Sequence, residues 1–449
     1  MKKLISLLMC GAICIGASAC STKTAEEPVY PDSYTPFRFA AYMTPPTPNA
    51  LNYGNPNYIT DLRYAEMAEC GFDYGYAIYE SVPEHIKAAL GYAEKNNIKY
   101  YVKDNEITWF ITGASQKELP ESLKTHIKET MDEYVPYKSF AGIIAADEIS
   151  KSCFGNAKLV KEYWDSLYPD KEFFINLLPM VASPSQLGTR DYQDHLDSYI
   201  AATKTEMLSY DYYPLIGAQD NEKVLGAQHL RNLEIAVNTA KKNKIPLYTF
   251  ILTMGHMNYR TPDHYDDIAW QIYSSMAYGA KGAQTFTYWT TMDKTDNTIT
   301  HGLIDQEGNR TPVYDAMKEV IAEVRAMEKY YMQFEYQGTI PYAGNPDLVQ
   351  NQMSILETPL KSHEALSGFS AENDMLIGAF ADKDGRDGFM VTNYCDPCLD
   401  KENKIELTFK DASAVLTIYK GKKQMTDLKK GKYSFTLKSG EGVFIIPVK

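Results

Sequence analysis

The stretch FAGIIAADE (residues 140–148) decides the fold, because it is an apolar run of strand length that ends in two carboxylates. Seven further runs of this kind lie along the first two thirds of the chain: FRFAAYM (37–43), FDYGYAI (72–78), KYYVKD (99–104), FFINLLP (173–179), EMLSYDYYP (206–214), LYTFILTMG (247–255) and GAQTFTYWT (282–290). Short apolar runs bounded by polar residues are typical of buried β-strands. The sequence therefore predicts eight strands.

Helical patterns separate these runs. PEHIKAALGYAEKNN (83–97) and ESLKTHIKETMDEYV (121–135) are two of them, and their apolar residues recur at three and four positions. Strands that alternate with helices form βα units and a parallel sheet. Eight units favour a closed (β/α)8 barrel over an open doubly wound sheet, since AAYMTPPTPN (40–49) lacks the glycine-rich turn that such sheets carry after the first strand.

The pattern changes after about residue 330. Strand-like runs follow one another without a helical pattern between the later ones, for example MLIGAFAD (375–382), KIELTF (404–409) and EGVFIIPVK (441–449). Turn-rich segments separate them, as in an antiparallel sandwich. We expect two domains, a (β/α)8 catalytic barrel over 37–330 and an all-β sandwich over 331–449.

The N-terminus has the layout of an export signal. Lys2 and Lys3 precede the apolar run LISLLMCGAICIGASA, which ends in small residues directly before Cys20. The run is too short for a spanning helix, which needs roughly 18 or more apolar residues, and signal peptides have this pattern. ASAC resembles the bacterial lipobox, so we expect a signal peptide over 1–19, a lipidated Cys20 and a flexible tether over 20–36. A plain secretory signal is the alternative.

This reading places the protein as an exported lipoprotein at the outer membrane, on the cell surface or on the periplasmic side. The net charge of −13 argues against nucleic acid as a partner, since no basic patch is assembled. Cys395 and Cys398 have the spacing of a metal knuckle, but the sequence has no second pair of this kind. A local disulfide, or two thiols without a functional role, is the favoured interpretation. No metal-ligand spacing occurs among the eight histidines, and no cofactor needs to be assumed.

The ends of the predicted strands carry the candidate functional residues. In a (β/α)8 barrel the chemistry lies at the carboxyl ends of the strands. Carboxylates stand there at Asp104, Asp147, Glu148 and Asp211. Aromatic and polar side chains accompany them, at Tyr42, Asn176, Tyr210, Tyr213, His256, Tyr288 and Trp289. Two or three carboxylates framed by aromatic rings suit the cleavage of a glycosidic bond, which needs a proton donor and a second carboxylate.

A family resemblance rests on these same segments. AGIIAADE (141–148), LSYDYYP (208–214), AYGAKGAQTFTYWT (277–290) and GLIDQEGNRTPVYDAMKEV (302–320) resemble exported Bacteroides-type glycoside hydrolases with a β-galactosidase-like barrel. TNY (392–394) and GEGVFIIP (440–447) resemble the small β-domain of those enzymes. The resemblance implies a glycan substrate and makes Glu148, at the end of the fourth strand, the general acid/base.

Two departures limit what the resemblance implies. The family has Asn-Glu where this chain has Asp147-Glu148, and the family's nucleophilic glutamate is missing from the seventh run, LYTFILTMGHMNYR (247–260). Asp211 is the remaining carboxylate placed to be nucleophile or water-activating base. Asp147 is expected to point away from Glu148, because neighbouring strand residues face opposite sides unless the strand has ended and the loop turns them.

The separation of the Glu148 and Asp211 carboxyl groups bears on the mechanism. Roughly 5 to 5.5 Å is typical of retaining enzymes and roughly 6.5 to 9.5 Å of inverting ones. The alternative function is not enzymatic: a catalytically inactive glycan-binding lipoprotein of a polysaccharide-uptake system. The absence of the family's nucleophilic glutamate from the seventh run favours this alternative. A lyase or an esterase has less support, since the GxSxG elbow of esterases is absent.

Overall fold

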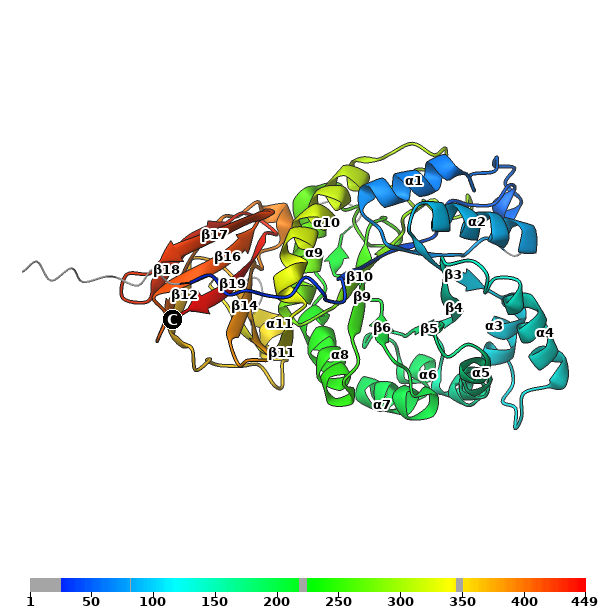
Figure 1. Cartoon of the computed structure of the whole chain (residues 1–449), viewed down its shortest axis with the longest axis horizontal. Coiled ribbons are helices and arrows are strands. Elements are labelled where there is room, and N and C mark those ends of the chain that lie inside the picture. Colours follow the sequence, from blue (N-terminus) through cyan, green and yellow to red (C-terminus); the bar gives the residue numbers. More distant parts are fainter. Residues whose placement is uncertain (1–25, 81, 218–223, 345–349) are drawn as a thin grey trace, which may run out of the picture.

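The computed structural model describes residues 26–80, 82–217, 224–344 and 350–449. Eight parallel strands form one sheet in the order β5-β4-β3-β2-β1-β10-β9-β6. Their bounds are β1 (Arg38–Tyr42), β2 (Tyr74–Tyr76), β3 (Lys99–Lys103), β4 (Phe140–Asp147), β5 (Glu172–Asn176), β6 (Leu208–Tyr210), β9 (Leu247–Leu252) and β10 (Gly282–Phe286). A parallel bridge between Leu177 and Tyr210 joins the two edge strands and closes the ring. The predicted (β/α)8 barrel is confirmed, and Figure 1 shows the ring with helices outside it.

The helices cover the outside of the barrel in chain order. They are α1 (Asp61–Cys70), α2 (Pro83–Lys95), α3 (Asn105–Thr112), α4 (Glu121–Asp132), α5 (Phe154–Leu167), α6 (Pro184–Leu187), α7 (Tyr192–Thr203), α8 (His229–Asn243), α9 (Tyr265–Ala277) and α10 (Pro312–Tyr331). A two-stranded hairpin, β7 (Leu215–Ile216) with β8 (Val224–Leu225), projects from the loop after β6. None of the described helices is long and apolar enough to cross a membrane.

An ion pair closes the amino-terminal end of the barrel interior. Arg38 donates from both terminal nitrogens to Glu172, at 3.0 and 2.8 Å, and to the Tyr101 hydroxyl at 2.7 Å. The guanidinium lies between the rings of Tyr74 and Tyr248, 4.1 and 4.4 Å from their centroids. Arginine stacks on aromatic faces and binds carboxylates with two donors. This end of the barrel is therefore a packed polar plug.

The C-terminal part is an antiparallel sandwich, as expected from the sequence. One sheet has the order β11-β13-β14-β19-β16-β17 and the other β12-β15-β18. The strands are β11 (Phe334–Tyr342), β12 (Leu366–Ala371), β13 (Met375–Asp382), β14 (Asp387–Asn393), β15 (Asn403–Phe409), β16 (Ala414–Tyr419), β17 (Lys422–Asp427), β18 (Lys432–Leu437) and β19 (Gly442–Val448), with one short helix, α11 (Gln350–Ser354). Cys395 precedes a short 3-10 turn, Pro397–Leu399, that contains Cys398, and the two cysteines form no disulfide.

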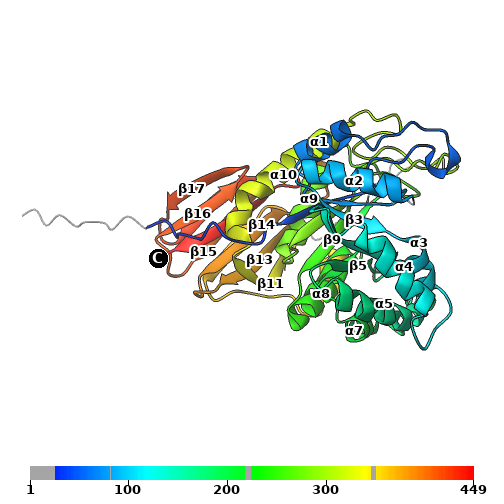
Figure 2. The same ribbon diagram turned by 45° about the vertical axis from the view of Figure 1, so that its right-hand side comes forward.

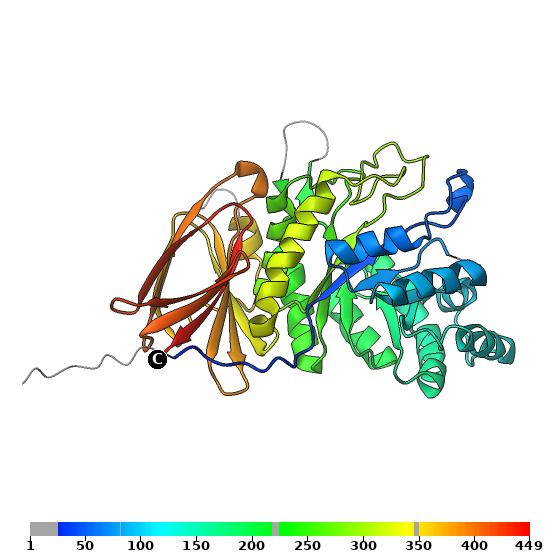
Figure 3. The ribbon, with the colours of Figure 1, turned by 45° about the horizontal axis from the view of Figure 1, so that its top comes forward.

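Helices α9 and α10 join the barrel to the sandwich. Figures 2 and 3 show α10 between the two parts. The ring of Trp270 stacks on Tyr394 at 4.9 Å, and Tyr331 contacts Phe380 and Phe444 at 5.3 and 5.7 Å. Arg260, in the loop after β9, donates to Asp396 of the sandwich at 2.6 Å. One apolar core therefore runs from the helix layer into the large sheet.

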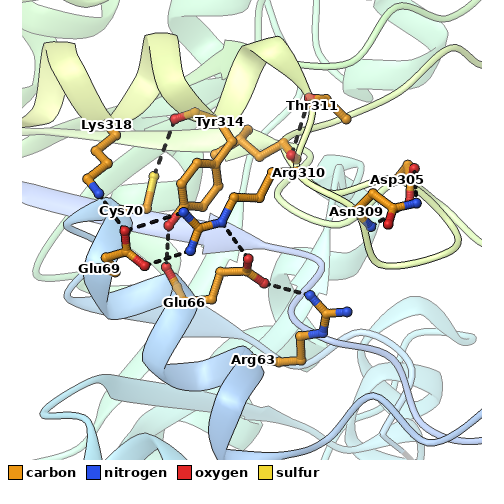
Figure 4. A network of polar contacts seen from close by, with 11 residues as sticks. Arg63, Glu66, Glu69, Cys70, Asp305, Asn309, Arg310, Thr311, Tyr314 and Lys318 are labelled. Carbon is orange, nitrogen blue, oxygen red and sulfur yellow. Dashed lines mark hydrogen bonds and ion pairs between the residues drawn. The ribbon is translucent and has the colours of Figure 1, made fainter.

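A network of ion pairs fixes the segment between β10 and α10. Arg310 contacts Glu66 and Glu69 of α1, each at 2.6 Å, and Lys318 of α10 contacts Glu69 at 2.6 Å (Figure 4). Glu66 also accepts from Arg63 at 2.8 Å. Networks of this kind stabilise more than single surface pairs do. The network holds the last loop of the barrel against its first helix.

The segment before β1 runs along the sandwich and α10 (Figure 2). Tyr30 is buried and donates to Asp382, while Glu27 pairs with Lys423 and Asp32 with Lys329. The predicted signal peptide, Cys20 and the first part of the predicted tether lie outside the described residues. The rest of the predicted tether, 26–36, lies on the protein surface in these contacts.

Glu80 is a buried carboxyl group beside β2 whose titration should affect stability. It accepts from Tyr100 at 2.7 Å, and burial raises its pKa from 4.5 to about 7. The folded state thus keeps a proton that the unfolded chain releases. The free energy of unfolding should fall as pH rises from about 4.5 to 7, by roughly 3 kcal/mol from this group. Urea unfolding of the wild type and Glu80→Gln over this range tests it, and equal slopes would contradict it.

Candidate functional site

A cavity of about 300 Å³ opens at the carboxyl ends of the barrel strands. Binding sites of (β/α)8 proteins lie at this face. Six strands or the loops that follow them contribute to the lining: Tyr42, Asp147, Glu148, Asn176, Pro179, Val181, Asp211, Tyr212, Tyr213, Phe250, His256, Met257, Tyr259 and Phe286. Among the predicted site residues, the structure brings together Tyr42, Asp147, Glu148, Asn176, Asp211, Tyr213 and His256.

Asp147 and Glu148 both line the cavity, so the expectation that Asp147 points away is wrong. The pairing of β4 with β5 shifts by one residue between Ile144 and Ala146, and this bulge brings Asp147 opposite Asn176. A bulge inserts one residue and re-aims the side chains that follow. Glu148 comes after the strand has ended, with φ of 49°, and this left-handed turn directs its side chain into the same cavity. Neighbouring residues thus share one site.

Hydrogen bonds from two strands, β1 and β5, fix the Asp147 carboxylate. Tyr42 donates its hydroxyl to Oδ2 at 3.1 Å, and the Asn176 amide donates to Oδ1 at 3.2 Å. The same amide nitrogen donates to Asp211 Oδ1 at 3.0 Å. One side-chain amide therefore lies between two carboxyl groups and uses both of its N–H donors.

The pKa values of all three carboxyl groups are raised. For Asp211 the largest cause is burial, followed by the charges of Glu148 and Asp147, and the pKa lies well above the usual range. For Glu148 the causes are burial and the charge of Asp147. The pKa of Asp147 is raised by burial against the opposing effect of its bonds to Asn176 and Tyr42, although its side chain remains open to the cavity. The cluster therefore keeps protons up to a higher pH than isolated carboxyl groups do.

The carboxyl groups of Glu148 and Asp211 lie close enough that each affects the pKa of the other. Two ionised carboxylates side by side repel each other, which favours a proton on one of them. The Glu148 side chain is exposed to the cavity.

Aromatic rings form part of the cavity wall. Tyr213 contacts Phe286 at 5.3 Å and Tyr259 at 5.7 Å, and His256 contacts the same two rings at 5.1 and 5.0 Å. Burial lowers the pKa of His256, which is therefore neutral near pH 7. Flat rings beside carboxylates give a surface with apolar faces and polar edges. None of the described lining residues is Lys or Arg.

Asp104 and Tyr210 lie outside this cavity. Asp104 caps α3 by accepting from the Ile107 amide at 3.0 Å, and its other oxygen contacts His126 at 2.9 Å. Acceptance of an N-terminal amide is the usual role of Asp in this position. Tyr210 is buried in the apolar layer between the barrel and its helices. The structure thus gives both side chains contacts away from the carboxyl cluster.

Tyr288 and Trp289 also belong to the packed core. Both are fully buried, Trp289 against Tyr58 at 4.6 Å and Tyr288 against Phe72 at 5.5 Å. Strand β10 ends at Phe286, four residues before the end of the predicted run. Phe286, not the Tyr-Trp pair, is the residue of this segment that faces the cavity.

The sequence analysis missed several lining residues, among them Phe250, Phe286 and Tyr259. Phe250 and Phe286 could have been found from the alternation of side chains along a strand, which puts Tyr248 and Phe250, and likewise Gln284 and Phe286, on one face. Tyr259 lies on a turn, for which no periodic signal exists. Within the described parts of the chain, no group of three or more His, Cys, Asp or Glu is arranged to hold a metal ion.

Comparison with known proteins identifies similar folds but no family. No family model matches the sequence, and no curated protein matches it. An alpha-amylase of Anoxybacillus has a similar structure, with a TM-score of 0.52 and 12% identity over 92% of this chain and 98% of that one. A putative alpha-L-fucosidase of Bacteroides thetaiotaomicron has a TM-score of 0.45 and 16% identity over 68% of this chain and 98% of that one.

A GH51 arabinofuranosidase of Xanthomonas axonopodis pv. citri has a TM-score of 0.44 and 10% identity, over 93% of this chain and 98% of that one. The structurally similar proteins are thus glycoside hydrolases of several types. The alpha-amylase shares both parts of this chain, so the likeness establishes a barrel followed by a β-domain.

Proposed function

We propose that the protein is a glycoside hydrolase whose proton donor is Glu148 and whose second carboxylate is Asp211. The observation that carries the proposal is the convergence of Asp147, Glu148 and Asp211 in one aromatic-walled cavity. Glycosidic bonds are cleaved by a protonated carboxyl group together with a carboxylate that attacks the sugar or activates water. The alpha-amylase of similar fold supports the proposal by showing that this architecture can host glycosidic chemistry.

The proton shared by Glu148 and Asp211 is the one delivered to the leaving oxygen. When a sugar ring enters, the proton passes to Glu148, which delivers it to the glycosidic oxygen, and Asp211 is left ionised. The Asn176 N–H that bonds Asp211 stabilises this anion. Asp211 then attacks the anomeric carbon or takes a proton from the attacking water.

Asp147 stabilises the positive charge that develops on the sugar ring. Tyr42 and Asn176 hold it in place, and a fixed carboxylate in a partly dehydrated cavity acts strongly on an oxocarbenium-like transition state. The rings of Tyr213, Phe286 and Tyr259 offer apolar faces to the sugar.

A glycan panel tests the proposed function. The wild type should release sugar from at least one neutral glycan or aryl glycoside, and Glu148→Gln should not. Tight binding of a glycan without any product from the wild type would overturn the hydrolase and support the glycan-binding alternative. The absence of a carboxylate from the cavity residues contributed by β9 and the following loop is the observation that favours that alternative.

Lipid attachment at Cys20 is a separate proposal that rests on the sequence. The anchor would hold the enzyme at the outer membrane, on the cell surface or the periplasmic side. In cells fed radiolabelled palmitate the wild type should be labelled and sediment with membranes. Cys20→Ala should be unlabelled and appear in the soluble fraction. A labelled Cys20→Ala protein, or an unlabelled wild type, would contradict the proposal.

A further inference from the structure

A chain of buried hydrogen bonds runs through the barrel interior and ends at the carboxyl cluster. Tyr76 on β2 donates its hydroxyl to Gln284 Oε1 on β10. Gln284 Nε2 donates to Ser209 Oγ on β6 at 2.9 Å, and Ser209 donates to Asn176 Oδ1 on β5 at 2.9 Å. The Asn176 amide nitrogen then donates to Asp147 and Asp211.

The chemistry of the groups fixes the direction of this chain. The Asn176 amide nitrogen donates to oxygens of Asp147 and Asp211, so the amide oxygen faces Ser209. Ser209 therefore donates to Asn176 and accepts from the Gln284 nitrogen. The Gln284 oxygen then faces Tyr76, which can donate because its phenol stays protonated. In this orientation every member of the chain has a hydrogen-bond partner.

The side chains of Tyr76, Gln284 and Ser209 do not line the cavity, and each of these residues is at most 1% exposed. Polar groups in a barrel interior cost free energy unless they are bonded, and a satisfied network fixes the orientation of its members. We propose that Tyr76, Gln284 and Ser209 are positioning residues that lock the Asn176 amide with both N–H groups toward Asp147 and Asp211, and so set the proton affinity of these carboxyl groups. The catalytic consequence rests on the proposed function.

Without the hydrogen bond from Ser209, the side-chain amide of Asn176 can rotate by 180° and place its oxygen beside the carboxyl groups of Asp147 and Asp211. Repulsion from that oxygen would favour the protonated acids and raise their pKa values further. The other titratable groups that face Asp147 and Asp211 stay in place in such a variant. They are Tyr42 on β1, Lys103 on β3, Glu148 after β4, Tyr192 on α7, Tyr210 on β6, and Tyr213 and Tyr259 in the loops.

Carboxyl ¹³C NMR titration of the full chain tests the inference without any substrate. Signals of Asp147 and Asp211 are assigned with Asp147→Asn and Asp211→Asn. We expect Ser209→Ala to raise the titration midpoint of at least one of them by about 1 pH unit, a tenfold change in proton affinity. Ser209→Thr keeps the hydroxyl and should restore the wild-type midpoint. Thr285→Val, which removes another buried hydroxyl on β10, is the matched control and should change nothing.

Unchanged midpoints in folded Ser209→Ala, or an equal shift in Thr285→Val, would overturn the inference. If Ser209→Ala does not fold, Tyr76→Phe decides, because it removes only the first donor of the chain and should shift the midpoints in the same direction. Failure of the proposed function is distinguishable. It would appear as a lack of glycan cleavage by the wild type, while the titration would still report whether the chain controls the carboxyl groups.

Discussion

Glu148→Gln should lower kcat/KM on a natural glycan by about 10² to 10⁴, the usual contribution of a positioned general acid. Gln keeps the size of the side chain and its place beside Asp211, but it cannot deliver a proton. The loss should depend on the leaving group. Aryl glycosides with acidic phenols need no protonation of the leaving oxygen, so the variant should be far closer to the wild type on these substrates.

Two further variants separate acid catalysis from a general disturbance of the cavity. Asp211→Asn should be impaired on both kinds of substrate, because the second carboxylate is needed whatever the leaving group. Glu162→Gln, which changes an exposed carboxyl group on α5, should behave as the wild type on both. A Glu148→Gln variant within a few-fold of wild type on the natural glycan would remove Glu148 from the mechanism.

Arg38→Leu should strongly destabilise the barrel. It leaves the Glu172 carboxylate among Tyr74, Tyr101 and Tyr248 without its cation. Breaking a buried ion pair from one side typically costs about 3 to 5 kcal/mol. Because the Glu172 side chain is 31% exposed, we expect about 3 kcal/mol, the lower end of that range. Urea unfolding followed by circular dichroism measures it.

The double variant Arg38→Leu/Glu172→Leu should recover most of this loss, since removal of both partners leaves no unpaired charge. Arg190→Leu is the matched control. Arg190 also pairs with a neighbouring carboxylate, Asp191, but its side chain is exposed, so its removal should leave the unfolding midpoint unchanged. A double variant as unstable as Arg38→Leu would show that packing, not the unpaired carboxylate, dominates this site.

The barrel could be predicted because its strands are continuous apolar runs. Seven of the eight predicted runs contain a whole barrel strand, and the run 173–179 overlaps β5, which begins one residue earlier at Glu172. The change to short antiparallel strands near residue 330 is equally visible in the pattern. Strand β10 shows the limit of this approach. Its pattern continues through Tyr288 and Trp289, but the strand ends at Phe286, and the last two aromatics pack in the core.

The arrangement of the side chains within the site could not be predicted from the sequence. Alternation along a strand places Asp147 and Glu148 on opposite faces, and only the bulge beside Ala146 with the left-handed Glu148 brings them together. No pattern marks a bulge in an apolar run. Asn176 was found as a polar residue in a strand, but its bonds to two carboxyl groups join residues from three strands, and sequence spacing carries no such information.

The most direct test of the central claim is the incubation of the wild type with its glycan in H₂¹⁸O, followed by mass spectrometry of the products. Hydrolysis by Glu148 and Asp211 predicts a released sugar that carries one ¹⁸O at its anomeric carbon, and no such product from Glu148→Gln. A product with an added double bond and no ¹⁸O, or binding across the panel with no product at all, would contradict the account.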